Sequence, residues 1–124
     1  MVRKLTASTE RYLVGIYKLQ NKKGIAKTSE LINLFRVAPG TVTNTIKRLK
    51  REGLVIHQPY KGIRLTEEGH EIALSVAKKY GVLERLLTDI LEVEVSLARE
   101  VAANIGYYIP DDIVEKIEKV LSKA

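Results

Sequence analysis

The clearest pattern in the chain lies in residues 27–55, where apolar positions recur with a helical period, stop, and then recur again. Thr28 is the predicted N-cap of the first of these two helices, with Glu30 in its first turn beside the positive end of the helix dipole. The apolar stripe of this helix consists of Leu31, Ile32 and Phe35. Pro39 then breaks the pattern and suits the first position of a new helix, because it lacks the N–H that a continuing helix would use. Two short helices joined by a tight turn are therefore expected.

The second helix, from about residue 39 to residue 51, has two faces of different character. Its apolar face is formed by Val42, Ile46 and Leu49, which fall at i, i+4 and i+7. The opposite face and its flanks carry Gly40, Thr41, Thr43, Asn44, Lys47, Arg48 and Arg51. These residues are small and polar at the N-terminal end and cationic at the C-terminal end. A recognition helix has this order, because its first turn enters the major groove and later Lys and Arg residues meet phosphates. A run of charge alone is more simply explained by a solvated helix face, so the next elements decide.

A β-hairpin is expected directly after the second helix. Gly53 is a typical helix stop, and two short β-prone runs, residues 54–56 and 63–65, flank a loop that contains Pro and Gly. Thr66 then caps a further helix. A helix–turn–helix followed by a hairpin is a winged helix, a DNA-binding module, and the tip of its wing would be Tyr60 and Lys61.

One helix precedes this module and a long one follows it. The opening helix spans residues 8–20, and its inner stripe is Leu13, Ile16 and Tyr17. The long helix is expected to run from Glu67 to about Tyr80, with an interruption at Gly81.

The last part of the chain contains more apolar helix surface than a small domain can cover. Residues 82–91 are strongly amphipathic, and helices are expected at about 96–105 and 110–121, the last with Pro110 at its first position. Such helices either pack on the winged helix or form a homodimer interface, and we favour the dimer, which would present two recognition helices to two half-sites. The candidate dimer contacts are Leu83, Leu86, Leu87 and Ile90.

The fold class is therefore mainly α with a small β-hairpin: a winged helix-turn-helix domain in residues 1–72 and a helical dimerisation domain in residues 73–124. Charge follows the same division. Residues 1–72 hold 14 Lys and Arg against 6 Asp and Glu, whereas residues 73–124 hold 7 against 9, within a net charge of +6. Positive charge concentrated on the winged helix suits a partner that is a polyanion.

Composition excludes several other classes of function. The chain has no cysteine, which removes disulfides, thiolate metal sites and cysteine nucleophiles. No Ser/His/Asp set, Gly-rich phosphate loop or metal-binding helix motif occurs, so we expect no enzyme. The two histidines, His57 and His70, are interpreted as surface or packing residues rather than ligands. The N-terminal segment Met1–Thr6 lacks an apolar signal core and no apolar run is long enough to span a membrane, so we expect a cytoplasmic protein.

Several short motifs add a family resemblance that covers essentially the whole chain. They are Thr9-Glu10-x-Tyr12-Leu13 with Ile16-Tyr17, Gly40-Thr41-Val42-Thr43, Arg51-Glu52-Gly53-Leu54-Val55, Leu65-Thr66-x-x-Gly69 and Glu84-Arg85-Leu86-Leu87-Thr88-Asp89-Ile90-Leu91. Together they resemble the diphtheria toxin repressor and manganese transport regulator family of metal-dependent transcriptional regulators. The last motif is the most specific, because other winged helices share the earlier ones. The chain looks like the short, two-domain type without a C-terminal SH3-like domain.

The resemblance implies a regulatory iron or manganese ion, but the usual ligands are largely missing. The positions that carry ligands in the family are here Arg11, Val14, Tyr80, Ala103, Gly106 and Tyr107, and only Glu84 is retained. Because such ions need three or more converging N, O or S donors, no cofactor is expected, and Mn or Fe would require relocated ligands. One hypothesis is that Arg11 replaces the charge of the metal by pairing with Glu84 or Glu100. The alternative is that Arg11 is simply exposed to solvent.

The sequence therefore predicts a homodimeric winged-helix transcriptional regulator that binds a pseudo-palindromic duplex DNA site independently of metal. Its partners would be double-stranded DNA and a second copy of the chain, with no membrane. The candidate DNA contacts are Thr41, Thr43 and Asn44 for bases, with Pro39 and Gly40 at the close approach, Lys27, Thr28, Lys47, Arg48 and Arg51 for phosphates, and Tyr60 and Lys61 on the wing. A metal-responsive repressor with relocated ligands and a winged-helix protein-interaction module are the alternatives.

Overall fold

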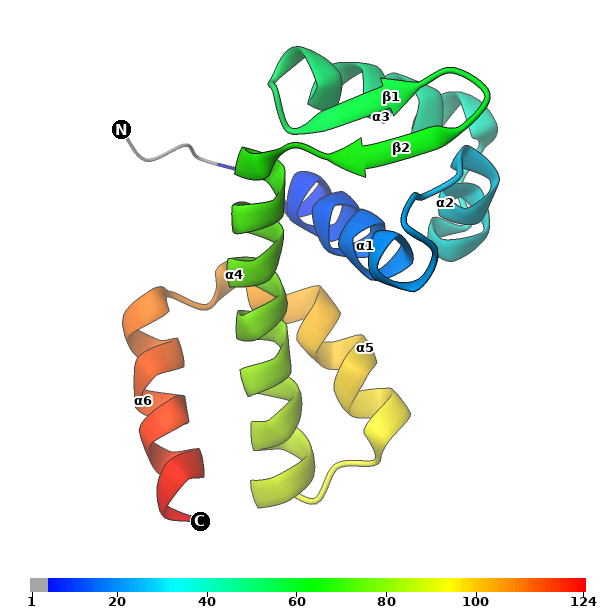
Figure 1. The fold of residues 1–124 in the computed structure, drawn as a ribbon. Coiled ribbons are helices and arrows are strands. Elements are labelled where there is room, and N and C mark those ends of the chain that lie inside the picture. The colour runs from blue at the N-terminus through cyan, green and yellow to red at the C-terminus, as the bar shows by residue number, and fades with distance from the viewer. Residues whose placement is uncertain (1–4) are drawn as a thin grey trace. The chain divides into compact units, whose positions relative to one another are not determined.

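The computed structural model describes residues 5–124, so most of the N-terminal segment considered above lies outside the described residues. The described part consists of helices, including a short 3-10 turn at Gly106–Tyr108, and one two-stranded antiparallel sheet (Figure 1). The chain divides into two compact units between Leu74 and Ser75. None of the helices in residues 5–124 combines the length and the apolar character that a membrane span requires.

The first unit is a winged helix, as predicted. Its elements are α1 (Ala7–Lys23), α2 (Thr28–Phe35), α3 (Pro39–Arg51), β1 (Val55–Gln58), β2 (Gly62–Leu65) and the beginning of α4 (Glu67–Arg85). Helices α1, α2 and α3 and the hairpin enclose one apolar core, whose most deeply buried members include Leu13, Ile16, Leu31, Val42, Leu49, Leu54 and Ile63. The predicted apolar faces of α1 and α3 are therefore confirmed.

The ends of α1 and the start of α2 show how local side chains define the helices. The Thr6 side chain accepts a hydrogen bond from the Thr9 N–H at 3.1 Å, and α1 ends at Gly24 with a φ of 83°. The prediction that Thr28 caps α2 is wrong, because the N-cap is Lys27. The Lys27 N–H donates to the Glu30 carboxylate at 3.0 Å. The side chain of Glu30 therefore satisfies the backbone N–H of the N-cap residue.

The same glutamate ties α2 to the end of α1. Glu30 Oε2 lies 2.8 Å from Lys23 Nζ. The hydrogen bond from Lys23, followed by the one from the Lys27 backbone, holds the pKa of Glu30 below its ordinary value. Glu30 is therefore ionised and already engaged at neutral pH.

The wing is a short hairpin whose first strand starts one residue later than predicted and ends two residues later, while the second strand starts one residue earlier than predicted. Val55 pairs with Leu65 and His57 with Ile63, so His57 and Gln58 belong to a strand and not to the loop. Tyr60 lies in the turn with a φ of 66°. The strand β2 is also tied to the segment before α2, because Ile63 and Ala26 exchange backbone hydrogen bonds of 2.7 and 2.9 Å.

Helix α4 starts as predicted but does not stop where predicted. The Thr66 hydroxyl accepts from the Gly69 N–H at 3.1 Å and donates to the Gly53 carbonyl at 2.7 Å. The expected interruption at Gly81 is wrong, because α4 continues to Arg85 and then into a π-helical turn, Leu86–Ile90. A glycine costs about 1 kcal/mol in a helix, and burial of the neighbouring Tyr80, Val82 and Leu83 side chains outweighs this cost.

The second unit packs two further helices with the C-terminal half of α4. Figure 1 shows α5 (Val95–Ile105) and α6 (Asp111–Lys123) beside it. Val82 of α4 forms a small core with Val114 and Leu121 of α6. Pro110 was predicted to be the first residue of α6, but it is the N-cap. Its ψ of 154° is extended, so the helix begins only at the next residue.

Candidate nucleic-acid interface

Helix α3 presents the exposed polar face that its sequence pattern predicts. Val42, Ile46 and Leu49 are buried, whereas the residues opposite them and on the flanks are exposed: Pro39, Gly40, Thr41, Thr43, Asn44, Lys47 and Arg51. A Cβ atom at Gly40 would meet nothing within 4 Å, so the fold itself does not require glycine there. The N-terminal turn of α3 therefore offers an open backbone surface to a partner.

Two of the threonines of α3 bond their hydroxyl groups to the helix backbone. Thr43 Oγ1 donates to the Pro39 carbonyl at 3.0 Å, and Thr45 Oγ1 donates to the Thr41 carbonyl at 2.9 Å. Thr43 can therefore offer a methyl group and an acceptor lone pair to a base edge, but its proton is engaged. Asn44, between them in the chain, is exposed and can offer both a donor and an acceptor.

Arg48 lies in a different environment from the other cations of α3. Its Nη1 donates to Thr9 Oγ1 at 3.0 Å and lies 3.1 Å from Glu52 Oε1. Thr9 is only 1% exposed and belongs to α1, so this contact joins two helices across 39 residues of sequence. The structure therefore places Arg48 among internal contacts of the first unit.

Two grooves flank His57 between α3, the start of α2 and the wing. One, of about 190 Å³, is lined by Thr28, Thr43, Ile46, Lys47, Lys50 and His57. The other, of about 330 Å³, is lined by Lys27, Thr28, Ser29, His57, Tyr60, Lys61 and Gly62. They bring together six of the predicted contacts, which are Lys27, Thr28, Thr43, Lys47, Tyr60 and Lys61, and Thr28 and His57 line both grooves. The other predicted contacts line neither groove: Pro39, Gly40, Thr41, Asn44, Arg48 and Arg51.

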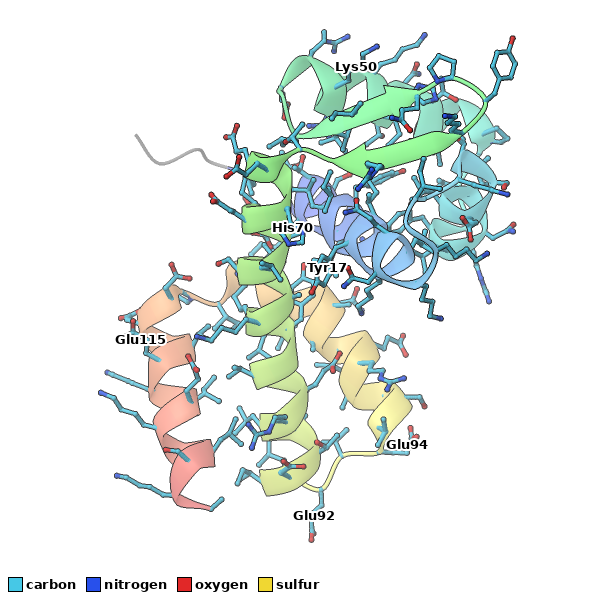
Figure 2. All side chains as sticks on the ribbon, in the orientation of Figure 1. Tyr17, Lys50, His70, Glu92, Glu94 and Glu115 are labelled. Atoms are coloured by element: carbon cyan, nitrogen blue, oxygen red, sulfur yellow. The ribbon has the colours of Figure 1, made fainter. Side chains whose placement is uncertain are left out.

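Five residues that line these grooves were missing from the sequence-based site: Ser29, Ile46, Lys50, His57 and Gly62. Lys50 and His57 are the two with basic side chains. Lys50 follows Lys47 by three residues, so helical periodicity alone could have placed it on the same side. In the view of Figure 2, Lys50 lies above the hairpin, whereas Tyr17 and His70 lie below the hairpin. His57 could not be assigned to the site without the extent of β1. Only the pairing of His57 with Ile63 shows that it belongs to this strand, from which it lines a groove beside α3.

The residues at the positions where metal ligands are implied do not fit an iron or manganese ion. In the first unit, Arg11 is exposed and cationic, and Val14 is a buried hydrocarbon side chain. In the second unit, the buried ring of Tyr80 covers Gly106, because a Cβ atom at Gly106 would lie 2.5 Å from ring atom Cε1. Ala103 and Tyr107 are half-buried, and Glu84 supplies the only carboxylate of the set. Within residues 5–124, no group of three or more His, Asp and Glu side chains is arranged to hold a metal ion.

The predicted dimer contacts occupy different environments. Leu83 is 3% exposed, so this chain already covers it, whereas Leu86 and Leu87 are half-buried and Ile90 is exposed. The second unit exposes further large apolar side chains that the sequence-based set did not include: Leu91, Val95, Leu97, Ile105, Tyr108, Ile113 and Val120. Exposed apolar surface of this kind is typical of an interface with another protein chain.

Comparison with known families assigns both halves of the chain. Residues 4–63 match the family described as iron dependent repressor, N-terminal DNA binding domain. Residues 66–124 match the family described as iron dependent repressor, metal binding and dimerisation domain.

Individual relatives agree with this assignment. An uncharacterised HTH-type transcriptional regulator of Methanocaldococcus jannaschii is 35% identical over 121 residues, which are 96% of each chain. Diphtheria toxin repressor of Corynebacterium glutamicum is 29% identical over 117 residues, which are 94% of this chain and 51% of the repressor. The chain thus spans about half the length of the diphtheria toxin repressors that it matches.

Solved structures show the same fold. The manganese regulator SloR is similar with a TM-score of 0.83 and 26% identity, over 97% of this chain and 56% of that chain. IdeR of T. acidophilum is similar with a TM-score of 0.86 and 22% identity, over 98% of this chain and 56% of that chain. Both likenesses extend over the winged helix and the helical unit that follows it.

Proposed function

The chain belongs to the iron-dependent repressor family, whose members are DNA-binding, metal-dependent repressors, and from this membership we propose that it is a homodimeric winged-helix transcriptional regulator of the cytoplasm. It binds a pseudo-palindromic duplex DNA site and catalyses no reaction. The observation that carries the proposal is the exposed face of α3, polar at its start and cationic at its end, with lysine-lined grooves beside it.

The residues of this face divide into base contacts and phosphate contacts. Thr41, Thr43 and Asn44 belong to the first turns of α3, which enter the major groove, while the open surface at Gly40 allows close approach. Phosphates are held by the groove residues Lys27, Thr28, Lys47 and Lys61, with Tyr60 at the tip of the wing. The exposed Arg51 at the end of α3 adds a further phosphate contact. Arg48 is not included among the phosphate contacts. Its Nη1 donates to Thr9, so its main role is to join α3 to α1.

The second unit supports a dimer. Residues 66–124 match a family described as a metal binding and dimerisation domain. The exposed apolar side chains of this unit supply surface that a second copy would cover. Two copies would present two α3 helices to half-sites about one helical turn of DNA apart.

Regulation in this chain would not depend on metal. The donors at the implied ligand positions are one carboxylate and two phenols, beside a fixed cation and three positions without donor atoms. A metal-responsive repressor with relocated ligands is the second candidate, because the matched C-terminal family is described as metal binding.

The test is selection of tight-binding duplexes from a randomised pool by chelator-treated protein, followed by titration with and without Mn²⁺, Fe²⁺ or Zn²⁺ at two salt concentrations. We expect an inverted repeat to be enriched, with salt-dependent affinity that added metal leaves unchanged. Binding that appears only with metal would establish the second candidate. Absence of salt-dependent DNA binding under every condition would leave a protein-interaction module.

A further inference from the structure

His57 occupies the centre of the candidate interface. It lies on β1 two residues after the buried Val55, so both side chains leave the strand on the same face, toward α3. Its own side chain is exposed and lines both grooves. Anything that fills either groove contacts this imidazole.

The charged groups that face His57 from the neighbouring elements are cations. Lys47 and Lys50 come from α3, Lys27 from the start of α2, and Lys61 from the wing. Tyr60 is the remaining titratable group that lines these grooves, and Arg64 follows the strand partner of His57 on β2.

No acidic side chain of the described residues lines either groove. The one carboxylate of α2 is that of Glu30, and it accepts hydrogen bonds from Lys23 Nζ and from the Lys27 N–H. A protonated His57 would therefore find like charges around it and no carboxylate in the grooves. An anionic ligand would reverse this balance.

The phosphates of DNA are such a ligand. Histidine is the side chain that ordinarily changes its charge between about pH 5 and pH 8, and the protonated ring donates from both nitrogens. Phosphate oxygens accept these hydrogen bonds and offset the repulsion from the four lysines. Because the coupling between two binding events is reciprocal, a phosphate that favours the proton is itself bound more tightly when the proton is present.

We propose that His57 is a proton-linked phosphate contact of the DNA interface, so that this chain binds duplex DNA more tightly as the pH falls from about 8 to about 6. The inference rests on the proposed function and adds a residue and a pH response to it. The lysines around His57 make sequence-independent contacts at every pH in this range, and His57 adds one more contact at the acidic end.

The experiment measures affinity for a duplex of mixed sequence as a function of salt at pH 6 and at pH 8, because phosphate contacts carry no sequence information. For the unmodified chain, the slope of log K against log salt should steepen at pH 6 by about 0.9 for each bound protomer. His57→Gln should abolish this difference between the two pH values. His57→Lys, a permanent cation, should bind at pH 8 with the slope that the unmodified chain has at pH 6.

His70 provides the matched control, since it is the only other histidine. Its ring lies 5.5 Å from that of Tyr17 (Figure 2). His70 lines neither groove. His70→Gln should keep the pH response of the unmodified chain. A pH response that survives His57→Gln, or that disappears in His70→Gln, would overturn the inference while leaving DNA binding in place. Absence of DNA binding at both pH values would instead refute the proposed function, and the inference with it.

Discussion

Lys47 and Arg48 are adjacent cations of α3, yet their contacts differ, and replacing each by alanine should separate DNA binding from folding. Lys47 is exposed and lines a groove beside His57. Arg48 is half-buried and joins α3 to the almost fully buried hydroxyl of Thr9 in α1. We expect Lys47→Ala to weaken binding with little effect on stability, and Arg48→Ala to lower the free energy of unfolding.

The magnitudes follow from the contacts of each residue. The pair between Arg48 and Glu52 is partly exposed and spans one helical turn, which is worth about 0.3–0.5 kcal/mol. The hydrogen bond from Arg48 to Thr9 involves a charged donor, and we take about 1.5 kcal/mol, the low end for such bonds, because Thr9 keeps a contact with the Thr6 hydroxyl. Arg48→Ala should therefore cost about 2 kcal/mol, or about 8 °C in Tm for a chain of this size.

Two assays distinguish the variants. Urea unfolding reports stability, and Lys47→Ala should stay within about 0.5 kcal/mol of the unmodified chain. DNA titration at several salt concentrations should show a slope reduced by about 0.9 per protomer for Lys47→Ala, with similar weakening for all sequences. Thr9→Val removes the partner of Arg48, so its effect and that of Arg48→Ala should not add in the double variant. An Arg48→Ala variant that unfolds like the unmodified chain and reduces the salt slope as Lys47→Ala does would show that Arg48 is a DNA contact and not a support of the fold.

Three further outcomes are expected. Asn44→Ala should cost about 1–3 kcal/mol of binding and relax specificity at one base position, measured on single-base variants of the selected duplex; equal losses on all of them would contradict a base contact. Gly81→Ala should stabilise the chain by about 0.5–1 kcal/mol, because its Cβ atom would meet nothing within 4 Å. Gly69→Ala should destabilise the chain by more than this, since its Cβ atom would overlap the Leu54 carbonyl oxygen. Unfolding curves with the opposite order of stability would refute this comparison. Arg11→Ala should lower DNA affinity or dimer stability if Arg11 replaces the charge of a metal, and leaving both unchanged would refute that hypothesis.

The winged helix was predictable because the residues that start and end its helices act locally. Pro39 starts α3, Gly53 lies just after it, and the Thr66 hydroxyl caps α4, each through a property of that one residue. The errors arose where a second residue decides. Glu30 satisfies the Lys27 N–H and so moves the start of α2. In α4, packing of the residues around Gly81 overrides the weak propensity of glycine.

The candidate site was predictable to the same extent. Helical periodicity placed the polar face of α3 correctly on the outside, because that face depends on one element alone. The internal contact of Arg48 depends on a residue 39 positions away, and no periodicity within α3 reveals it. The groove around His57 needs the hairpin register together with the start of α2, so it appears only once three elements are assembled.

The second unit shows why the implied metal ligands would not return one at a time. The ring of Tyr80 fills the space over Gly106, and its atoms Cε1 and Cδ1 would lie 2.5 and 2.6 Å from a Cβ atom there. Gly106→Glu alone would therefore force a buried ring out of its place, whereas Tyr80→His alone would leave no carboxylate at position 106. The two residues support each other, because glycine makes room for the ring and the ring covers the backbone at the glycine. Regaining donors at both positions requires both changes together, and the packing of α4 against the end of α5 thus favours the pair that the chain now has.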